Sequence, residues 1–137
     1  TLTPIRKGEF VMTYVGEVIT DCEAEKRGLT YGETGNNKIM MTTLPAYTDD
    51  INTFVRHLDA RHLTNIAPFL NHSCNPNLTM VNVYVSRQPM PLFAFFARRD
   101  IAAGQVLCTS YNWYDAGTGA GSVRCHCGEP ECCGWLK

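Results

Sequence analysis

The chain has 137 residues, of which 45% are hydrophobic and 18% are charged, and its formal net charge is -1. This balance is typical of one ordinary globular domain with a core of its own, and the nearly neutral charge argues against a general nucleic-acid binder. No run approaches the ~18 apolar residues of a membrane span, and no secretory signal is present. The sequence starts without Met and stops just after a Cys-rich cluster, so we expect a piece of a longer protein.

The first predicted elements are a strand pair and a short helix. Aromatic and β-branched residues predict a strand over 10–15 and a second strand at 18–19. Thr20 and Glu23 have the spacing of a capping box, and Gly28 can end a helix, so residues 21–27 are predicted to be helical.

The middle and the end of the chain are rich in turn residues. Residues 31–50 suggest loops around one short strand, because Gly, Asn and Pro recur there. Two β-rich runs at 77–85 and 92–97 are expected to be neighbouring strands, and residues 100–111 form another turn and strand. A Gly-rich linker follows over 111–122. The elements therefore predict a mostly β fold with little helix.

Cysteine usage points to a metal. The chain has seven cysteines, an odd number, and four of them fall in the segment CHCGEPECC at 125–133. Such crowding without secretory features favours Zn²⁺ over disulfides, since structural zinc takes four tetrahedral ligands. The alternative is a cluster of reduced thiols without a metal.

Three thiolates of the predicted zinc site are local, namely Cys125, Cys127 and Cys132. The fourth ligand is Cys133, His126 or a remote residue. Adjacent cysteines point their side chains apart, and His126 lies between two ligands, so both are awkward. Cys22 and Cys108 fall in predicted helix and strand. Cys74, in the segment PFLNHSCNPN at 68–77, is the favoured remote ligand.

Three ordered segments carry a resemblance to a known family: FLNHSCNPN, IAAGQVLCTSYNW and CHCGEPECCGWL. They resemble signatures of the SET-domain protein lysine methyltransferases, and GEFVMTYVGEVIT resembles that family's N-terminal strand pair. The long connection NVYVSRQPMPLFAFFA is most similar to the heterochromatin-type (Suppressor-of-variegation) enzymes that modify lysine 9 of histone H3. The resemblance covers nearly the whole chain and is weakest over 29–52.

The resemblance implies a fold and a domain division. The fold would be a SET-domain fold of several small sheets with a knot-like C-terminal threading, plus a post-SET zinc loop. Residues 1–112 would be the SET core, starting after the family's Gly-x-Gly cofactor motif and without the Cys-rich pre-SET segment, and residues 113–137 the linker and post-SET segment. In the subgroup, the zinc ligands would be Cys74, Cys125, Cys127 and Cys132.

The resemblance also implies an S-adenosylmethionine site. Asn71 and His72 match cofactor contacts, and Asn65 matches a family Asn, although an Asn that closes a turn is the alternative. Trp135 matches an aromatic residue near the channel mouth, with a Trp that covers the zinc loop as its alternative. Because His72 and Cys74 are two residues apart on an extended segment, a nucleophile–base pair stays open as well.

Two tyrosines match the family's catalytic positions. Tyr111 matches the catalytic tyrosine, which would orient the lysine amine and also contact the cofactor's methyl region. Tyr14 matches a tyrosine that lines the lysine channel. For either residue, the alternative is a half-buried strand aromatic. Asp59 is expected to be structural, bonding backbone.

The implied function is methyl transfer from S-adenosylmethionine to a lysine of the histone H3 tail, in the nucleus and on chromatin. Chromatin contact would run through other domains of the parent protein, with no membrane and no sequence-specific nucleic acid bound by this segment. Departures from the family pattern leave methylation degree open and support two rivals, a catalytically degenerate binding module and a zinc-stapled β domain that is only structural. The residues that depart from the family pattern are Leu63, Thr64 and Pro68 before the NHSC segment, and Gln105, Val106, Thr109 and Ser110 after it.

Overall fold

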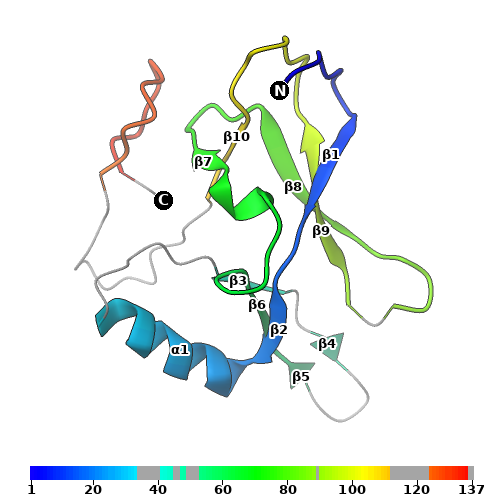
Figure 1. The fold of residues 1–137 in the computed structure, drawn as a ribbon, viewed down its shortest axis with the longest axis vertical. Helices are drawn as coiled ribbons and strands as arrows, with labels where there is room; N and C mark the ends of the chain where they lie inside the picture. The colour runs from blue at the N-terminus through cyan, green and yellow to red at the C-terminus, as the bar shows by residue number, and fades with distance from the viewer. Residues whose placement is uncertain (34–40, 45–46, 49–52, 89, 112–123, 136–137) are drawn as a thin grey trace. The chain divides into compact units, whose positions relative to one another are not determined.

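The computed structural model describes residues 1–33, 41–44, 47–48, 53–88, 90–111 and 124–135. Within them the chain forms short strands, one α-helix and one 3₁₀ turn (Figure 1). In chain order the elements are β1 (Phe10–Tyr14), β2 (Glu17–Thr20), α1 (Asp21–Glu33), β3 (Met41–Thr43), β4 (Tyr47–Thr48), β5 (Thr53–Phe54), β6 (Arg56–Asp59), the 3₁₀ turn Ala67–Phe69, β7 (Asn71–His72), β8 (Leu78–Val83), β9 (Leu92–Ala97) and β10 (Cys108–Thr109).

The strands in the described part of the chain form four small sheets. Their orders are β1-β9-β8, β10-β7, β2-β6-β3 and β4-β5. This arrangement confirms the prediction of a mostly β fold with little helix, and β8 and β9 are neighbours as the sequence predicts. No helix in the described part of the chain is long and apolar enough to cross a membrane.

The chain divides into two compact units. The first comprises Thr1–Met12, Phe69–Val81 and Ala94–Lys137, and the second comprises Thr13–Pro68 and Asn82–Phe93. The strands β1, β8 and β9 each contribute residues to both units.

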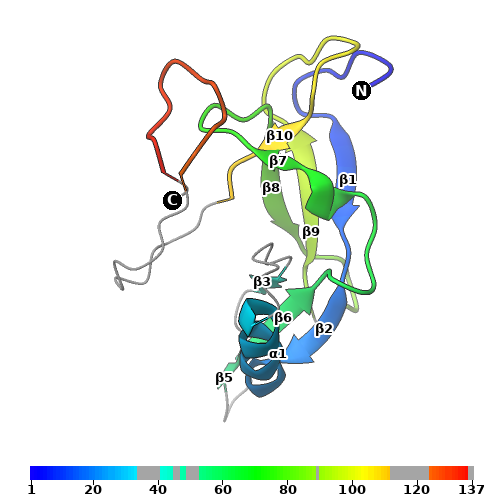
Figure 2. The same ribbon diagram turned by 60° about the vertical axis from the view of Figure 1, so that its left-hand side comes forward.

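The first unit has a core of apolar side chains from β8, β9 and the segment that follows them. Leu78, Phe95 and Ile101 are buried. The backbone of Ile101 also exchanges hydrogen bonds with that of Ile5, at 2.9 and 2.8 Å, which fixes the N-terminal segment. In the same unit β7 and β10 lie side by side and run parallel, with Asn71 opposite Cys108 and His72 opposite Thr109 (Figure 2).

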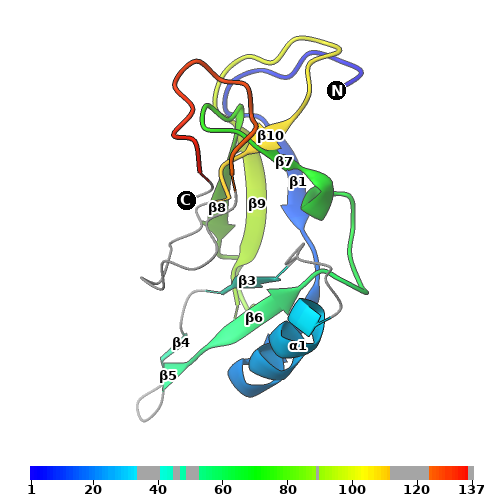
Figure 3. The same ribbon diagram turned by 90° about the vertical axis from the view of Figure 1, so that its left-hand side faces the viewer.

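The second unit packs α1 against β2 and β6. Figure 3 shows α1 beside β6. Its core cluster contains Leu44, Leu58 and Phe93, with Tyr14 packed against it. Just before β2, a Cβ at Gly16 would lie 2.8 Å from the carbonyl oxygen of Asp59. Only glycine therefore allows the backbone to approach β6 this closely.

Helix α1 continues past the predicted end. The side-chain oxygen of Thr20 accepts a hydrogen bond from the Glu23 amide at 3.3 Å, so the predicted cap is present. Gly28, however, does not end the helix, which runs to Glu33. A glycine inside a helix costs only ~1 kcal/mol relative to alanine. Buried Tyr31, whose hydroxyl donates to Asp59 at 2.8 Å, fixes the following turn and offsets that cost.

The remaining differences concern short strands. The prediction of a single strand within residues 31–50 gives too few strands, because β3 and β4 both lie in that range. The strand predicted near the end of 100–111 is limited to Cys108–Thr109, and Tyr111 lies two residues beyond it. Most of the predicted Gly-rich linker, residues 112–122, falls outside the described residues.

Candidate metal and cofactor site

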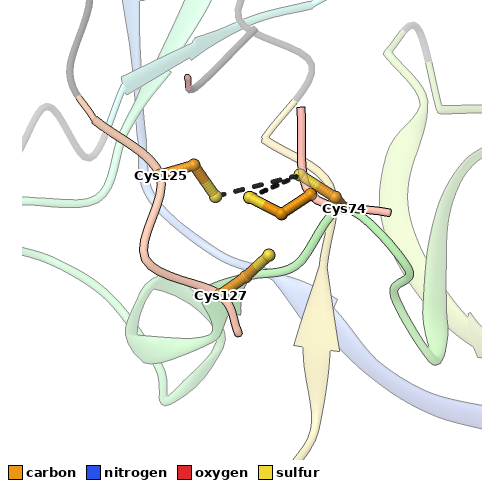
Figure 4. Close-up of side chains that lie close together, drawn as sticks. Cys74, Cys125 and Cys127 are labelled. Carbon is orange, nitrogen blue, oxygen red and sulfur yellow. Dashed lines mark hydrogen bonds between the residues drawn. The ribbon is translucent and has the colours of Figure 1, made fainter. Parts of the chain in front are cut away.

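Four cysteine sulfurs converge in the first unit. The Sγ atoms of Cys74, Cys125, Cys127 and Cys132, which we call the thiol cluster, all lie within 4.8 Å of one another. Figure 4 shows the side chains of Cys74, Cys125 and Cys127 close together. Cys74 Sγ lies 3.8 Å from Cys125 Sγ and 3.9 Å from Cys132 Sγ. A tetrahedral ion with Zn–S bonds of ~2.3 Å places its sulfurs ~3.8 Å apart. The spacing of the thiol cluster therefore fits a structural zinc site, and its members are those the sequence analysis favours.

The C-terminal loop is folded so that its thiols face Cys74. Gly128 and Gly134 both have positive φ angles, of 74° and 82°. These angles reverse the chain after Cys127 and after Cys133. The backbone amide of Gly134 points at Cys132 Sγ at 3.4 Å, and the amide of Cys125 donates to the Gly134 carbonyl at 2.9 Å. These contacts close the loop around the sulfurs.

The thiols of the cluster differ in how easily they ionise. The backbone amides of Cys74 and of Glu129 lower the pKa of the Cys127 thiol to about 6, whereas burial and neighbouring sulfurs raise the pKa of the Cys74 and Cys125 thiols. Metal ions bind the thiolate and not the thiol, so the Cys127 thiol is ready to bind a metal near neutral pH.

Cys133 also lies near Cys74. Its Sγ is 3.5 Å from Cys74 Sγ, and the Sγ of the adjacent Cys132 is 3.9 Å from the same atom. The set with all mutual distances within 4.8 Å nevertheless contains Cys132 and not Cys133. The Cys133 thiol donates instead to the Trp135 carbonyl at 3.0 Å.

A carboxylate that the sequence analysis did not single out joins the two halves of this site. The Glu129 carboxylate accepts hydrogen bonds from the Ser73 hydroxyl at 3.3 Å and from the side-chain Nδ2 of Asn75 at 3.4 Å. It therefore ties the C-terminal loop to the segment that carries Cys74. Sequence alone offers no signal for this pair, because the partners are more than fifty residues apart.

His72 and Tyr111 meet beside the thiol cluster. The backbone N–H of Tyr111 donates to His72 Nδ1 at 3.1 Å, and the two rings pack edge to face with centroids 5.3 Å apart. The Tyr111 hydroxyl donates to the Leu70 carbonyl at 2.9 Å. Burial lowers the pKa of His72 and raises the pKa of Tyr111, so the imidazole is neutral and the phenol protonated at neutral pH.

The nucleophile–base alternative has one contact in its favour, since His72 Nε2 lies 3.4 Å from Cys74 Sγ. Cys74, however, is also surrounded by three other sulfurs of the thiol cluster. A sulfur in that position is better suited to hold a metal than to attack a substrate. The geometry therefore favours a ligand role for Cys74.

A cleft of about 610 Å³ opens next to these residues, within the first unit. Its volume lies within the ~300–1,000 Å³ range of ligand pockets. Polar and aromatic side chains dominate its lining, which includes Asn71, His72, Arg99, Gln105, Tyr111 and Arg124. Of the residues predicted to hold the cofactor, Asn71, His72 and Tyr111 thus share one cleft.

Asn77 is a second residue that the sequence analysis did not single out. Its buried amide donates to the Val106 carbonyl at 2.8 Å and accepts from the Cys108 amide at 2.8 Å. Both bonds anchor the segment that leads through β10 to Tyr111. An Asn just after an Asn-Pro turn reads from sequence as part of the turn, which hides this role.

The other predicted site residues belong to different parts of the structure. Trp135 is exposed and belongs to the C-terminal loop, where its backbone pairs with that of Arg124. Tyr14 belongs to the second unit, where it lines an apolar cleft of about 310 Å³ with Leu44 and Phe93. Two residues that depart from the family pattern differ in burial, since Leu63 is exposed and Thr109 is buried.

Asn65, also in the second unit, is held by backbone groups on both sides of its amide. Its Nδ2 donates to the Thr13 carbonyl at 2.7 Å, and its Oδ1 accepts from the Ala67 amide at 3.1 Å. These bonds give it the turn-closing role that the sequence analysis left open, and its contact with a cofactor stays a prediction.

Asp59 has the structural role that the sequence predicts, but with more partners. It accepts from the Arg61 amide at 3.0 Å, from Arg27 at 2.9 Å and from Tyr31 at 2.8 Å. Arg27 also binds Glu17 at 2.7 Å and Glu23 at 2.9 Å. We call Glu17, Glu23, Arg27, Tyr31 and Asp59 the Asp59 network.

Comparison with known proteins places these features in a family. The model of the SET domain matches residues 1–112. The histone-lysine N-methyltransferase SUV39H1-A of Danio rerio is 42% identical over 113 residues, covering 81% of this chain and 26% of the relative. SUV39H2 of Gallus gallus is 38% identical over 152 residues, covering 100% of this chain and 36% of the relative.

A third relative, the histone-lysine N-methyltransferase Su(var)3-9 of Drosophila melanogaster, is 34% identical over 139 residues, which cover 95% of this chain and 21% of the relative. The chain thus spans between about a fifth and about a third of the length of these three relatives.

Proposed function

The chain belongs to the SET domain family, and on that premise we propose that it transfers a methyl group from S-adenosylmethionine to a lysine of the histone H3 tail. The target would be lysine 9. The observation that carries this proposal is the convergence of Asn71, His72 and Tyr111 on one cleft, next to the thiol cluster. We place the SET core at residues 1–112 and the linker and post-SET segment at 113–137.

The cofactor supplies a methyl group activated on a positively charged sulfonium. Asn71 and His72 would hold it in the cleft of the first unit, with Trp135 and Asn65 as further contacts. The cleft is large enough for a ligand of this size. The acceptor lysine has to be neutral, although the ordinary pKa of a lysine amine is ~10.4. An apolar surrounding disfavours the charged ammonium form.

Two tyrosines would prepare that amine. Tyr14 lines an apolar cleft in the second unit, which is the kind of lining that a lysine channel needs. Tyr111 keeps its proton at neutral pH and its hydroxyl is held against the Leu70 carbonyl, so it can orient an amine and the methyl region through hydrogen bonding. After deprotonation, transfer of a methyl group depends mainly on alignment, and positioning groups supply it.

Zinc, in this proposal, is structural. The four thiolates of Cys74, Cys125, Cys127 and Cys132 would occupy all four tetrahedral positions and leave none open for substrate. Zinc would then fasten the C-terminal loop to the segment that carries the cofactor residues.

The proposed setting is the nucleus, on chromatin. The relatives named above are histone-lysine N-methyltransferases, which supports a histone tail as the substrate of this chain. The bulk of the parent protein would supply further chromatin contacts through other domains. The number of methyl groups added depends in this family on an aromatic position where this chain has Thr109, so the product state has to be measured.

Methylation of peptides tests the proposal. The full-length parent protein, given S-adenosylmethionine and a histone H3 tail peptide, should add mass in steps of one methyl group, read by mass spectrometry. A matched peptide with arginine in place of lysine 9 should stay unmodified. Methylation of both peptides alike would move the target to another lysine, and methylation of neither would contradict the proposal.

Cofactor binding separates the rivals. An enzyme should bind S-adenosylhomocysteine in calorimetry when the segment before Thr1 is present, and the 137-residue chain should bind it more weakly. Absence of binding at millimolar ligand would favour the degenerate binding module or the purely structural domain. Thr109, Ser110 and Leu63 are the residues that support those rivals, because they depart from the family pattern.

A further inference from the structure

Both ring nitrogens of His72 have partners, and the two partners belong to different parts of the site. Nδ1 accepts a hydrogen bond from the backbone N–H of Tyr111 at 3.1 Å. Nε2 lies 3.4 Å from the Sγ of Cys74, a member of the thiol cluster. One imidazole therefore stands between the metal-binding sulfurs and the proposed catalytic tyrosine.

The chemistry of the two contacts fixes the tautomer. A backbone N–H can only donate, so Nδ1 has to be the unprotonated nitrogen of the ring. In a neutral imidazole the hydrogen then resides on Nε2, which faces Cys74 Sγ. The sulfur of Cys74 accepts this hydrogen, and a metal ion would hold that sulfur at a fixed position.

We propose that His72 is a positioning residue that couples occupancy of the thiol cluster to the placement of Tyr111. A metal ion would fix the position of Cys74 Sγ, this sulfur would hold the imidazole through Nε2–H, and Nδ1 would then hold the backbone of Tyr111. The inference rests on the proposed zinc site, and it gives the histidine side chain a role beyond contact with the cofactor.

The surrounding structure supports a short and rigid connection. The Ser73 amide donates to the Thr109 carbonyl at 2.9 Å, and His72 lies opposite Thr109 in the parallel pair of β7 and β10. The backbone on both sides of the imidazole is thus held independently of the ring. A change at the ring should therefore be felt at its two partners and not across the whole unit.

Two conservative variants separate the two contacts. In His72→Asn the side-chain oxygen takes roughly the place of Nδ1, so the acceptor for Tyr111 is kept and the contact with Cys74 is lost. In His72→Gln the side-chain nitrogen takes roughly the place of Nε2, so the donor to Cys74 is kept and the contact with Tyr111 is lost. His126→Asn is a matched control, because His126 is an exposed histidine of the C-terminal loop outside the thiol cluster.

Two measurements on the zinc-loaded protein report separately on the two contacts of the His72 ring. The rate of zinc transfer to a chromogenic chelator reports on Cys74, and amide hydrogen exchange of Tyr111, followed by NMR, reports on the Nδ1 contact. The amide of Cys108, which donates to Asn77, is the internal reference for general opening. Neither measurement requires the enzyme to be active.

We expect His72→Asn to lose zinc about 10–100-fold faster, because removing a group that supports a metal ligand typically lowers metal affinity about 10–100-fold. His72→Gln should release zinc near the normal rate but exchange the Tyr111 amide about 2–10-fold faster, as expected for loss of one hydrogen bond. In the unmodified protein, zinc removal should speed Tyr111 exchange relative to Cys108, and in His72→Gln it should not. His126→Asn should match the unmodified protein in both measurements.

Equal rates of zinc release from His72→Asn and from the unmodified protein would overturn the inference. An amide exchange rate of Tyr111 that is the same with and without zinc in the unmodified protein would overturn it as well. In both cases the zinc would still be bound, so the proposed zinc site would stand. Absence of zinc from the unmodified protein would instead overturn the zinc site and the coupling together.

Discussion

The thiol cluster and the Asp59 network each join distant segments of the chain, but only the Asp59 network supplies charges of both signs itself. Arg27 lies among the carboxylates of Glu17, Glu23 and Asp59, and every one of these ion pairs is between 2.7 and 2.9 Å. The thiol cluster brings together four sulfurs, which repel one another once they are ionised. Its positive charge has to come from an ion.

This difference separates a structural network from a metal site. A network with internal donors and acceptors stabilises the fold as soon as the chain folds. A set of like ligands at tetrahedral spacing stabilises it only with a metal, whose binding energy then becomes folding energy. Removing one member of the thiol cluster or of the Asp59 network should therefore have different consequences.

Cys74→Ser should have the largest effect. It removes the remote ligand, so zinc affinity should fall by orders of magnitude and the C-terminal loop should detach from the segment at 71–75. Zinc content by metal analysis and proteolysis of the loop measure the two effects. Cys133→Ser is the matched control and should keep one zinc per chain. Full zinc retention in Cys74→Ser would show that the ligand set is wrong.

Asp59→Asn should have an intermediate effect that does not depend on metal. It keeps the shape of a buried side chain but removes the charge that binds Arg27, and hydrogen bonds to charged groups contribute ~1.5–3 kcal/mol. Urea unfolding should report a loss of that size, equal with and without a chelator. A loss that appears only in zinc-free protein would mean that the two regions are not independent.

The same network predicts a loss of stability in acid. Burial opposes ionisation of Asp59, but hydrogen bonds from Arg27, Tyr31 and the Arg61 amide outweigh it and lower the pKa of Asp59. Hydrogen bonding from Arg27 likewise lowers the pKa of Glu17. Their contribution is complete above the ordinary carboxyl pKa of ~4 and is lost as the pH falls through the folded-state values. Below pH ~4 the unmodified protein should lose stability more steeply than Asp59→Asn does.

Thr20→Ala should have the smallest effect. The Thr20 oxygen accepts one exposed hydrogen bond from the Glu23 amide at 3.3 Å, and loss of such a cap costs ~1 kcal/mol. Thermal unfolding should show a small decrease with zinc content unchanged. Thr20→Ser, which keeps the hydroxyl, is the matched control. An unchanged melting temperature in Thr20→Ala would mean that the cap contributes nothing to α1.

The sequence predicts these features to different degrees, and the reason lies in the range of the interactions. The strand Leu92–Ala97 is predictable because its aromatic residues favour a pleated, buried position. The members of the thiol cluster are predictable because few other residues can complete the local set of three cysteines. The end of α1 is not, because the contact between Tyr31 and Asp59 spans 28 residues.

The candidate site shows the same difference between local motifs and contacts that are distant in sequence. Local motifs identify His72, Cys74 and Tyr111, but they do not show that His72 contacts the other two. Glu129 and Asn77 are missed for the same reason, since their partners lie 29 or more residues away and leave no periodic pattern. A single sequence therefore predicts which residue types act, and the structure adds how they are joined.

Tyr111→Phe tests the proposed catalytic role most directly. The change removes one hydroxyl, whose bond to the Leu70 carbonyl contributes only ~1 kcal/mol to stability, and keeps the ring that packs on His72. Turnover of the histone H3 peptide and calorimetric binding of S-adenosylhomocysteine are measured on the same full-length protein. We predict that turnover falls ~10²–10⁴-fold while cofactor binding changes little, because the hydroxyl acts mainly in the transition state. Turnover close to that of the unmodified protein would contradict the account and leave Tyr111 as a packing residue.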